Sequence, residues 1–190
     1  IYSGIDVPPL DNSAMDGYAV QSRDTRNASS ESPRFLSVIG MVAAGSISER
    51  EVEPGTAIRI MTGAPVPRGS DSVVKFEDTD ELLRRESATD RQPPTEIGIL
   101  RQAKAGLNIR RAGEDIRKGS LVLSKGVVIR PSEVGVLASL GHSKVMAIRR
   151  PVIAIIATGD ELVDINQPLS LGKIYNSNTY SMAALVLRYG

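Results

Sequence analysis

The residues best suited to chemistry lie in the segment 106–116, GLNIRRAGEDI. Its adjacent arginines, Arg110 and Arg111, suit bidentate binding of a phosphate or a carboxylate. Glu114 and Asp115 supply oxygen ligands of the kind that hard cations prefer. The same side chains would also form a cluster of surface ion pairs, which is the commoner explanation for such a sequence. The segment therefore predicts either an ion-binding site or a set of surface ion pairs.

Polar residues also fill the segment Asp11–Val20, DNSAMDGYAV. No helical or alternating period fits it, so its side chains are not spaced to form one buried face. Its first three residues can bond nearby backbone groups and hold a tight loop. Gly17 permits a positive φ or a close backbone approach. Taken alone, the segment is explained by an Asx-type turn that leads into a strand at Tyr18.

Two further loops have the same polar, non-periodic character. Met61–Pro67 contains two prolines and places Thr62 just after a predicted strand. Thr158–Leu162, TGDEL, follows the continuous apolar run Val152–Ala157, which predicts a strand buried on both faces of a parallel sheet. The carboxyl ends of such strands are where open α/β sheets bind ligands.

Strand and helix patterns surround these loops. Helices are predicted at Pro131–Leu140, ending at Gly141, and after Asn178 as the capping residue. Asp78–Pro94 is charged and is expected to form a solvated hairpin, and a domain boundary is expected at Arg149–Pro151. Further strands are predicted at 35–42, 56–60, 72–76, 97–103, 120–123, 127–129 and 144–148.

The composition is that of an ordinary globular protein. Of the 190 residues, 41% are hydrophobic and 24% are charged, which suffices for one large domain or two small ones. The net charge of +1 and the aromatic content of 4% argue against a nucleic-acid or acidic membrane surface. With no Cys and one His, the chain cannot form a disulfide or the usual zinc site.

Further expectations concern the cellular compartment and the two ends of the chain. The lack of Cys permits a reducing cytoplasm, and we expect a cytoplasmic protein. No signal peptide and no apolar run of membrane-spanning length are evident. The chain begins with Ile and stops at Gly190 just after an apolar helical pattern, so it is expected to be a piece of a longer protein.

The four loops DNSAMDGYAV, RIMTGAPVP, NIRRAGEDI and TGDEL occur in this order. Together they resemble the molybdopterin molybdenumtransferase family, which includes the C-terminal domain of gephyrin, over essentially all 190 residues. DNSAMDGYAV is highly specific, whereas related pterin- and nucleotide-binding domains share loops like TGDEL. The resemblance implies insertion of molybdate into adenylylated molybdopterin, with Mg²⁺ required and AMP released. It also implies a homodimer whose active sites are shared between subunits.

The resemblance implies roles for specific residues. The expected catalytic residues are Asp16, Thr62, Asp115 and Glu161. Asp115 and Glu161 are also the expected Mg²⁺ ligands, because releasing AMP from a pyrophosphate needs charge neutralised by a cation that carboxylates hold. If the carboxylates serve catalysis, they should lack full compensation by ion pairs.

Other residues are expected to bind the substrate. Arg110 and Arg111 match basic residues near the anionic substrate. Thr158, Gly159 and Asp160 are expected to contact the molybdopterin. Asn176 stands where the family usually has Asp.

The expected fold class is α+β and mainly β. The resemblance implies that a β-rich domain, 13–117, is inserted into a small linking domain formed by 1–12 and 118–150. Residues 151–190 would be the truncated start of an α/β molybdopterin-binding domain, with its first strand and helix.

The expected partners follow from the hypothesis that the chain is part of an enzyme. They are a second copy of the chain and other proteins of the molybdopterin pathway, with neither nucleic acid nor membrane. The alternative is a non-catalytic scaffold of the gephyrin type that binds partner peptides. The four polar loops favour the enzyme, because a scaffold does not need their catalytic residues. A freestanding nucleic-acid-binding β-domain is disfavoured by the charge and the aromatic content.

Overall fold

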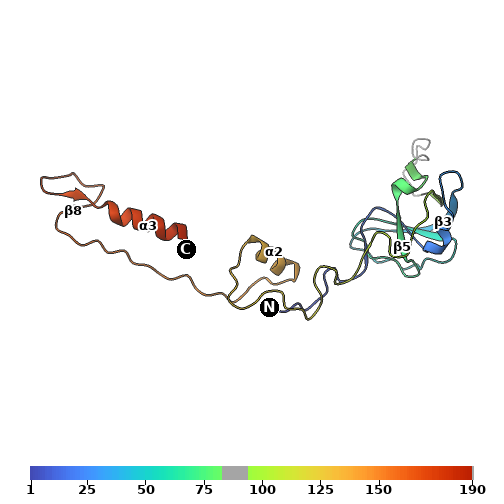
Figure 1. The fold of residues 1–190 in the computed structure, drawn as a ribbon, viewed down its shortest axis with the longest axis horizontal. Coiled ribbons are helices and arrows are strands. Elements are labelled where there is room, and N and C mark those ends of the chain that lie inside the picture. The colour runs from blue at the N-terminus through green and yellow to red at the C-terminus, as the bar shows by residue number, and fades with distance from the viewer. Residues whose placement is uncertain (83–93, 190) are drawn as a thin grey trace. The chain divides into compact units, whose positions relative to one another are not determined.

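Most of the regular structure lies in the first of two units into which the chain folds (Figure 1). The computed structural model describes residues 1–82 and 94–189, and the units are Ile1–Ser143 and Lys144–Gly190. The elements are β1 (Asn12–Ser13), β2 (Gly17–Val20), η1 (Ser22–Thr25), β3 (Arg34–Val42), β4 (Thr56–Ile60), β5 (Ser72–Lys75), η2 (Phe76–Asp78), β6 (Glu96–Ile99), β7 (Ile109–Arg110), α2 (Pro131–Ser139), β8 (Leu162–Val163), β9 (Ile174–Tyr175) and α3 (Ser177–Tyr189).

The first unit is built on a mixed sheet with the strand order β5-β2-β4-β3-β6. β2 is antiparallel to both β4 and β5, and β3 is parallel to β4. Alternate residues of β2 enter different hydrophobic clusters, with Tyr18 and Val20 in one and Ala19 in the other. β4 was predicted to be half buried, but Ala57 and Ile58 are both buried because both faces of the sheet are covered. The mainly β, α+β fold class is confirmed.

The predicted strands that are confirmed are those that pair with another strand of the sheet. Those at 35–42, 56–60, 72–76 and 97–103 appear as β3 to β6 with ends shifted by a few residues. The strands predicted at 120–123, 127–129 and 144–148 are wrong, and in that region only an isolated bridge joins Leu121 to Tyr2. Most of Asp78–Pro94 lies outside the described residues, but Glu81 is 2% exposed and therefore not solvated.

The start of the chain pairs with the segment that follows the β-rich part. Val7 donates its N–H to the carbonyl of Ile116 at 2.8 Å, and Ser3 donates to Ser120 at 3.0 Å. This antiparallel contact brings together the two sides of residues 13–117, as an inserted domain requires. It supports the division into 1–12 with 118–150 and 13–117, which remains a prediction.

The helix α2 confirms the helix predicted at 131–140. Pro131 stands at its first position, and the N–H of Arg130 donates to the carboxylate of Glu133 at 2.8 Å. Gly141 follows with φ of 76°, the left-handed conformation that ends many helices.

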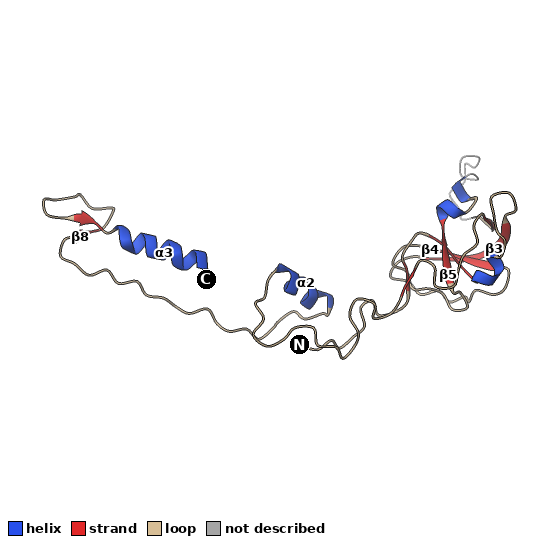
Figure 2. Cartoon of the chain, viewed as in Figure 1, coloured by secondary structure: helices blue, strands red, loops and turns tan. Residues whose placement is uncertain are grey.

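The second unit contains a short parallel ladder and a helix. β8 pairs with β9, and α3 follows directly (Figure 2). The helix was predicted, but its capping residue is Asn176 and not Asn178, since the side-chain oxygen of Asn176 accepts the N–H of Thr179 at 3.2 Å. Among the described residues, no helix is long and apolar enough to cross a membrane.

The strand predicted at Val152–Ala157 is absent. The segment has no assigned strand, and Val152 and Ile156 are 80% and 81% exposed. A strand buried on both faces needs neighbours that pair with its backbone and cover its side chains. No strand of the described chain pairs with this segment, so the prediction of an α/β first strand is wrong for this structure.

Replacing Gly17 with Ala is expected to lower the free energy of unfolding by at least ~2 kcal/mol. The added Cβ would lie 2.0 Å from the carbonyl oxygen of Val74, at the end of the β2–β5 ladder. Urea unfolding followed by circular dichroism measures the change. In the control Gly135→Ala, inside α2, the Cβ would meet nothing within 4 Å, so stability should hold or rise. Equal losses in both variants would contradict the role of this close approach.

Candidate functional site

The register of β2 against β4 brings Asp16 to Thr62. Gly17 lies opposite Ile60, so the residue before β2 faces the residues just after β4. One carboxylate oxygen of Asp16 accepts both the N–H of Thr62, at 2.6 Å, and its hydroxyl, at 2.7 Å. Both residues are exposed.

These hydrogen bonds favour the charged form of Asp16. The Thr62 hydroxyl, the Thr62 N–H and the positive charge of Arg59 lower the pKa of Asp16 below its ordinary value. The second carboxylate oxygen has no hydrogen-bond donor among the described residues. Asp16 is therefore a charged, oriented carboxylate with one oxygen available to a ligand.

Ser13 joins the loops that carry Asp16 and Thr62. Its N–H donates to the carbonyl of Ala64 and its own carbonyl accepts the N–H of Gly63, both at 2.9 Å. Its hydroxyl donates to the carbonyl of Met15 at 2.5 Å, and the residue is 1% exposed. The sequence predicted that Ser13 would hold its own loop, but not that it would bind the second loop.

The third loop meets the first through a short ladder. β1 pairs with β7, with Asn12 opposite Arg110, and Ala14 donates its N–H to the carbonyl of Asn108 at 2.9 Å. The loops DNSAMDGYAV, RIMTGAPVP and NIRRAGEDI are thus linked by main-chain bonds, although they are far apart in the sequence.

The charged residues of the third loop form ion pairs. The Nη2 of Arg110 lies 2.7 Å from both carboxylate oxygens of Asp115, and its Nε lies 3.7 Å from Glu114. The Nη1 of Arg111 lies 2.5 Å from Asp11. The hydrogen bond from the Ala112 N–H is the largest cause that lowers the pKa of Asp11, and the Arg111 guanidinium lowers it further.

The expectation that Asp115 lacks compensation is therefore wrong in this structure, which has the ion-pair cluster that the sequence left as the alternative. The side chains of Arg110 and Arg111 are 41% and 62% exposed. Exposed ion pairs are weak, so an anionic ligand can exchange for a carboxylate here.

Thr158, Gly159, Asp160 and Glu161 belong to the second unit. Gly159 has φ of 152°, and a Cβ there would lie 2.5 Å from a carboxylate oxygen of Glu161. The carboxylate of Glu161 is therefore folded back against its own loop. Asp160 accepts a hydrogen bond from the Lys173 ammonium through its carbonyl.

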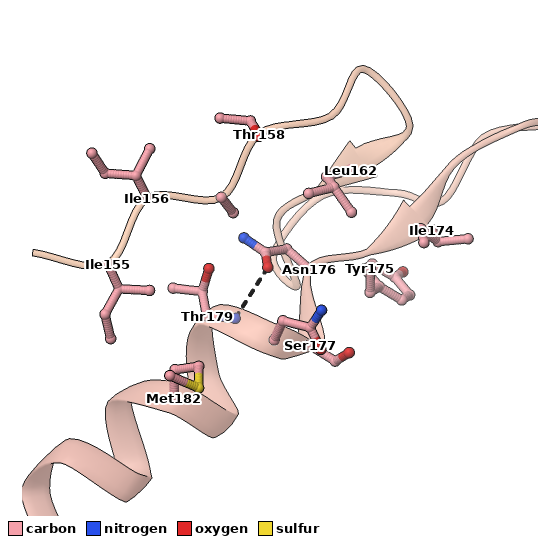
Figure 3. A pocket seen from close by; sticks show the side chains of 12 residues that line it. Ile155, Ile156, Thr158, Leu162, Ile174, Tyr175, Asn176, Ser177, Thr179 and Met182 are labelled. Carbon is pink, nitrogen blue, oxygen red and sulfur yellow. Dashed lines mark hydrogen bonds between the residues drawn. The ribbon is translucent and has the colours of Figure 1, made fainter.

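A pocket of about 280 Å³ lies beside this loop (Figure 3). Thr158 lines it from the loop, while Tyr175, Asn176, Thr179 and Met182 line it from β9 and α3. The Thr179 hydroxyl is buried and has no partner among the described residues. Thr158 was predicted as a molybdopterin contact and Asn176 was noted only as a departure from the family, whereas Tyr175, Thr179 and Met182 were not predicted as site residues. The signal available was the polar run NSNT that follows β9.

The carboxylates of the described residues do not gather into a magnesium site within either unit. Among residues 1–82 and 94–189, no three His, Cys, Asp or Glu side chains gather closely enough to hold a metal. Both oxygens of Asp115 accept from Arg110, and Glu161 lies in the other unit.

Thr62→Val is expected to raise the pKa of Asp16 toward its ordinary value, because it removes the hydroxyl donor while keeping the shape and the backbone N–H. Carbon-detected NMR titration of the Asp16 carboxyl measures the change. Thr62→Ser, which keeps the hydroxyl, should leave the pKa low. An unchanged pKa in Thr62→Val would show that the hydroxyl does not bind Asp16 in solution.

Comparisons with known proteins show the family to which the chain belongs. Residues 1–141 match the family model described as "MoeA N-terminal region (domain I and II)". The molybdopterin molybdenumtransferase of Bacillus subtilis is 41% identical over 184 residues, which are 97% of this chain and 41% of that protein. The Staphylococcus epidermidis protein of the same name is 40% identical over all 190 residues, or 43% of its length.

A solved structure is also similar. The molybdopterin biosynthesis MoeA protein of Pyrococcus horikoshii OT3 superposes with a TM-score of 0.84 at 35% identity, covering 100% of this chain and 48% of that one. The chain thus spans less than half the length of these relatives. The chain belongs to the molybdopterin molybdenumtransferase (MoeA) family, and its residues 1–141 match the family's N-terminal region.

Proposed function

We propose that this chain is part of an enzyme that inserts molybdate into adenylylated molybdopterin and releases AMP. The curated relatives named molybdopterin molybdenumtransferase support a role in molybdenum cofactor biosynthesis. The single observation that carries the proposal is the exposed Asp16–Thr62 pair, in which the carboxylate keeps one oxygen available. A carboxylate in this state can orient a polar group of the substrate without first losing a proton.

The arginines of the third loop would neutralise the anionic substrate. Arg110 and Arg111 are exposed and present planar donors that suit phosphate or molybdate oxygens. When an anion replaces Asp115 as the partner of Arg110, the carboxylate of Asp115 becomes free in turn. We propose catalytic roles for Asp16, Thr62, Asp115 and Glu161 on this basis.

The second unit would supply the contacts to molybdopterin. Thr158, Gly159 and Asp160 lie on the loop beside the pocket, and Glu161 lies on the same loop. The pocket combines apolar side chains such as Met182 with the hydroxyl of Thr179, as a site for a largely flat heterocycle does.

We further propose a homodimer in which the loops of one subunit complete the site with the TGDEL loop of the other. Mg²⁺ is part of this proposal, with Asp115 and Glu161 as ligands contributed by two subunits.

The remaining proposals concern organisation and setting. Residues 1–12 and 118–150 would form the linking domain, 13–117 the inserted domain, and 151–190 the start of the molybdopterin-binding domain. The protein would act in the cytoplasm, with other proteins of the molybdopterin pathway as partners. The scaffold alternative is not favoured, because peptide binding on this fold does not require an exposed carboxylate oriented by Thr62.

The direct test is molybdate-dependent release of AMP from adenylylated molybdopterin by the whole natural protein. Asp115→Asn should lower the rate at least ~10²-fold, the scale of losing one preorganised charge. Its free energy of unfolding should change by less than ~1 kcal/mol, because the Arg110 pair that it weakens is exposed.

Glu51→Gln is the matched control, because Glu51 is an exposed carboxylate paired with Arg68 at 3.8 Å. It should leave the rate unchanged. Absence of AMP release by the unaltered protein would refute the proposed function. Full activity with a large loss of stability in Asp115→Asn would instead assign that residue an anchoring role.

A further inference from the structure

A buried charged cluster lies beside the Asp16–Thr62 pair. The Nη2 of Arg59 lies 3.1 Å from one carboxylate oxygen of Glu81, and their side chains are 11% and 3% exposed. The Tyr18 hydroxyl donates to the other oxygen of Glu81 at 2.7 Å. Burial, reinforced by the carboxylate, raises the pKa of Tyr18, so this hydroxyl remains a donor.

Aromatic contacts fix the guanidinium of Arg59 further. Its central carbon lies 4.6 Å from the centroid of the Phe76 ring, which packs edge-on against Tyr18 at 5.8 Å. Its Nη1 lies 3.5 Å from the sulfur of Met41. The planar group is thus held between an aromatic face and a carboxylate.

Stability alone does not account for this cluster. Burying an ion pair costs desolvation free energy that the attraction often fails to recover. The Nε of Arg59 is also buried without a partner among the described residues, and an unsatisfied donor costs about 1–3 kcal/mol. Apolar side chains could fill the same space more favourably, so the position of the guanidinium itself calls for a reason.

Tyr18, Arg59 and Phe76 connect the cluster to the Asp16–Thr62 pair. Tyr18 and Arg59 are direct partners in the β2–β4 register, and they lie close in sequence to Asp16 and Thr62 respectively. The N–H of Phe76 donates to the carbonyl of Asp16 at 3.2 Å. The charge of Arg59 also contributes to the low pKa of Asp16.

We propose that Arg59 is a positioning residue, which holds the Asp16 carboxylate against Thr62 through its contacts with Phe76 and with the Tyr18–Glu81 pair. It acts from beneath the loop and does not itself contact substrate. The inference rests on the proposed function for its kinetic consequence, whereas the geometry that it describes exists without substrate.

The test uses the double variant Arg59→Met with Glu81→Gln in the whole natural protein. Removing both charges avoids leaving a charge of the pair buried alone, so the melting temperature should stay near that of the unaltered protein. With Asp16 less firmly placed, kcat for AMP release should fall ~10-fold or more, with little change in KM. The amide proton resonance of Thr62, which reports its bond to Asp16, should shift.

The control is Arg68→Met with Glu51→Gln, which removes an exposed ion pair of 3.8 Å and should change none of these quantities. A stable double variant with unaltered kcat and an unmoved Thr62 resonance would overturn the proposal.

A second variant tests the proposal if the double variant does not fold. Arg59→Lys keeps the charge but loses the planar contact with Phe76, and it should also lower kcat and shift the Thr62 resonance. If neither variant folds, Arg59 serves stability and the proposal is wrong. If the unaltered protein releases no AMP, the proposed function fails, and the Thr62 resonance alone decides on positioning.

Discussion

The position of β2 between two antiparallel neighbours determines where the other functional elements lie. Because β2 pairs with both β4 and β5, the loop before it emerges beside the end of β4, where Thr62 lies. The β5 backbone approaches so closely that a side chain at position 17 has no room, which is why Gly17 fits there. Ser13 then ties the loop to the residues after β4, and the β1–β7 ladder adds the arginine loop. Three segments distant in sequence thus meet through backbone bonds, which are independent of the charged side chains that they present.

The charged groups of the first unit fall into two physical classes. Glu81 is buried and the Arg59 side chain is only 11% exposed, so breaking their ion pair is costly. The pairs Arg110–Asp115 and Arg111–Asp11 are exposed, so they are weak and can be exchanged for a ligand. In the proposed function the two classes have different tasks: the fixed groups hold a carboxylate in place, and the exposed pairs would open for an anion.

The sequence predicted the fold well where local patterns are matched by partners within the chain. The strands β3 to β6 have alternating or apolar sequences and found neighbours in one sheet, and α2 carries its own start and stop residues. Val152–Ala157 has an equally apolar sequence, but no strand of residues 1–82 and 94–189 pairs with it, and sequence pattern does not reveal whether a partner is present.

The candidate site was predicted less completely. The motifs identified Asp16 and Thr62, but the residue types of the arginine loop fit ion binding and ion pairing equally well, and only coordinates show that Arg110 pairs with Asp115. The buried pair of Arg59 and Glu81 was missed, because Glu81 lies in a charged segment that resembles solvated loops, and burial of a charge depends on distant residues.

In the proposed homodimer, the loops of one subunit act together with the TGDEL loop of a second copy. Mixed dimers of the whole natural protein, pairing an Asp115→Asn subunit with a Glu161→Gln subunit, test it most directly. In such a dimer one site lacks both carboxylates and the other retains both. The account predicts that AMP release recovers to roughly half that of the unaltered dimer, since one of the two shared sites is intact. Mixed dimers as inactive as either parent would contradict it.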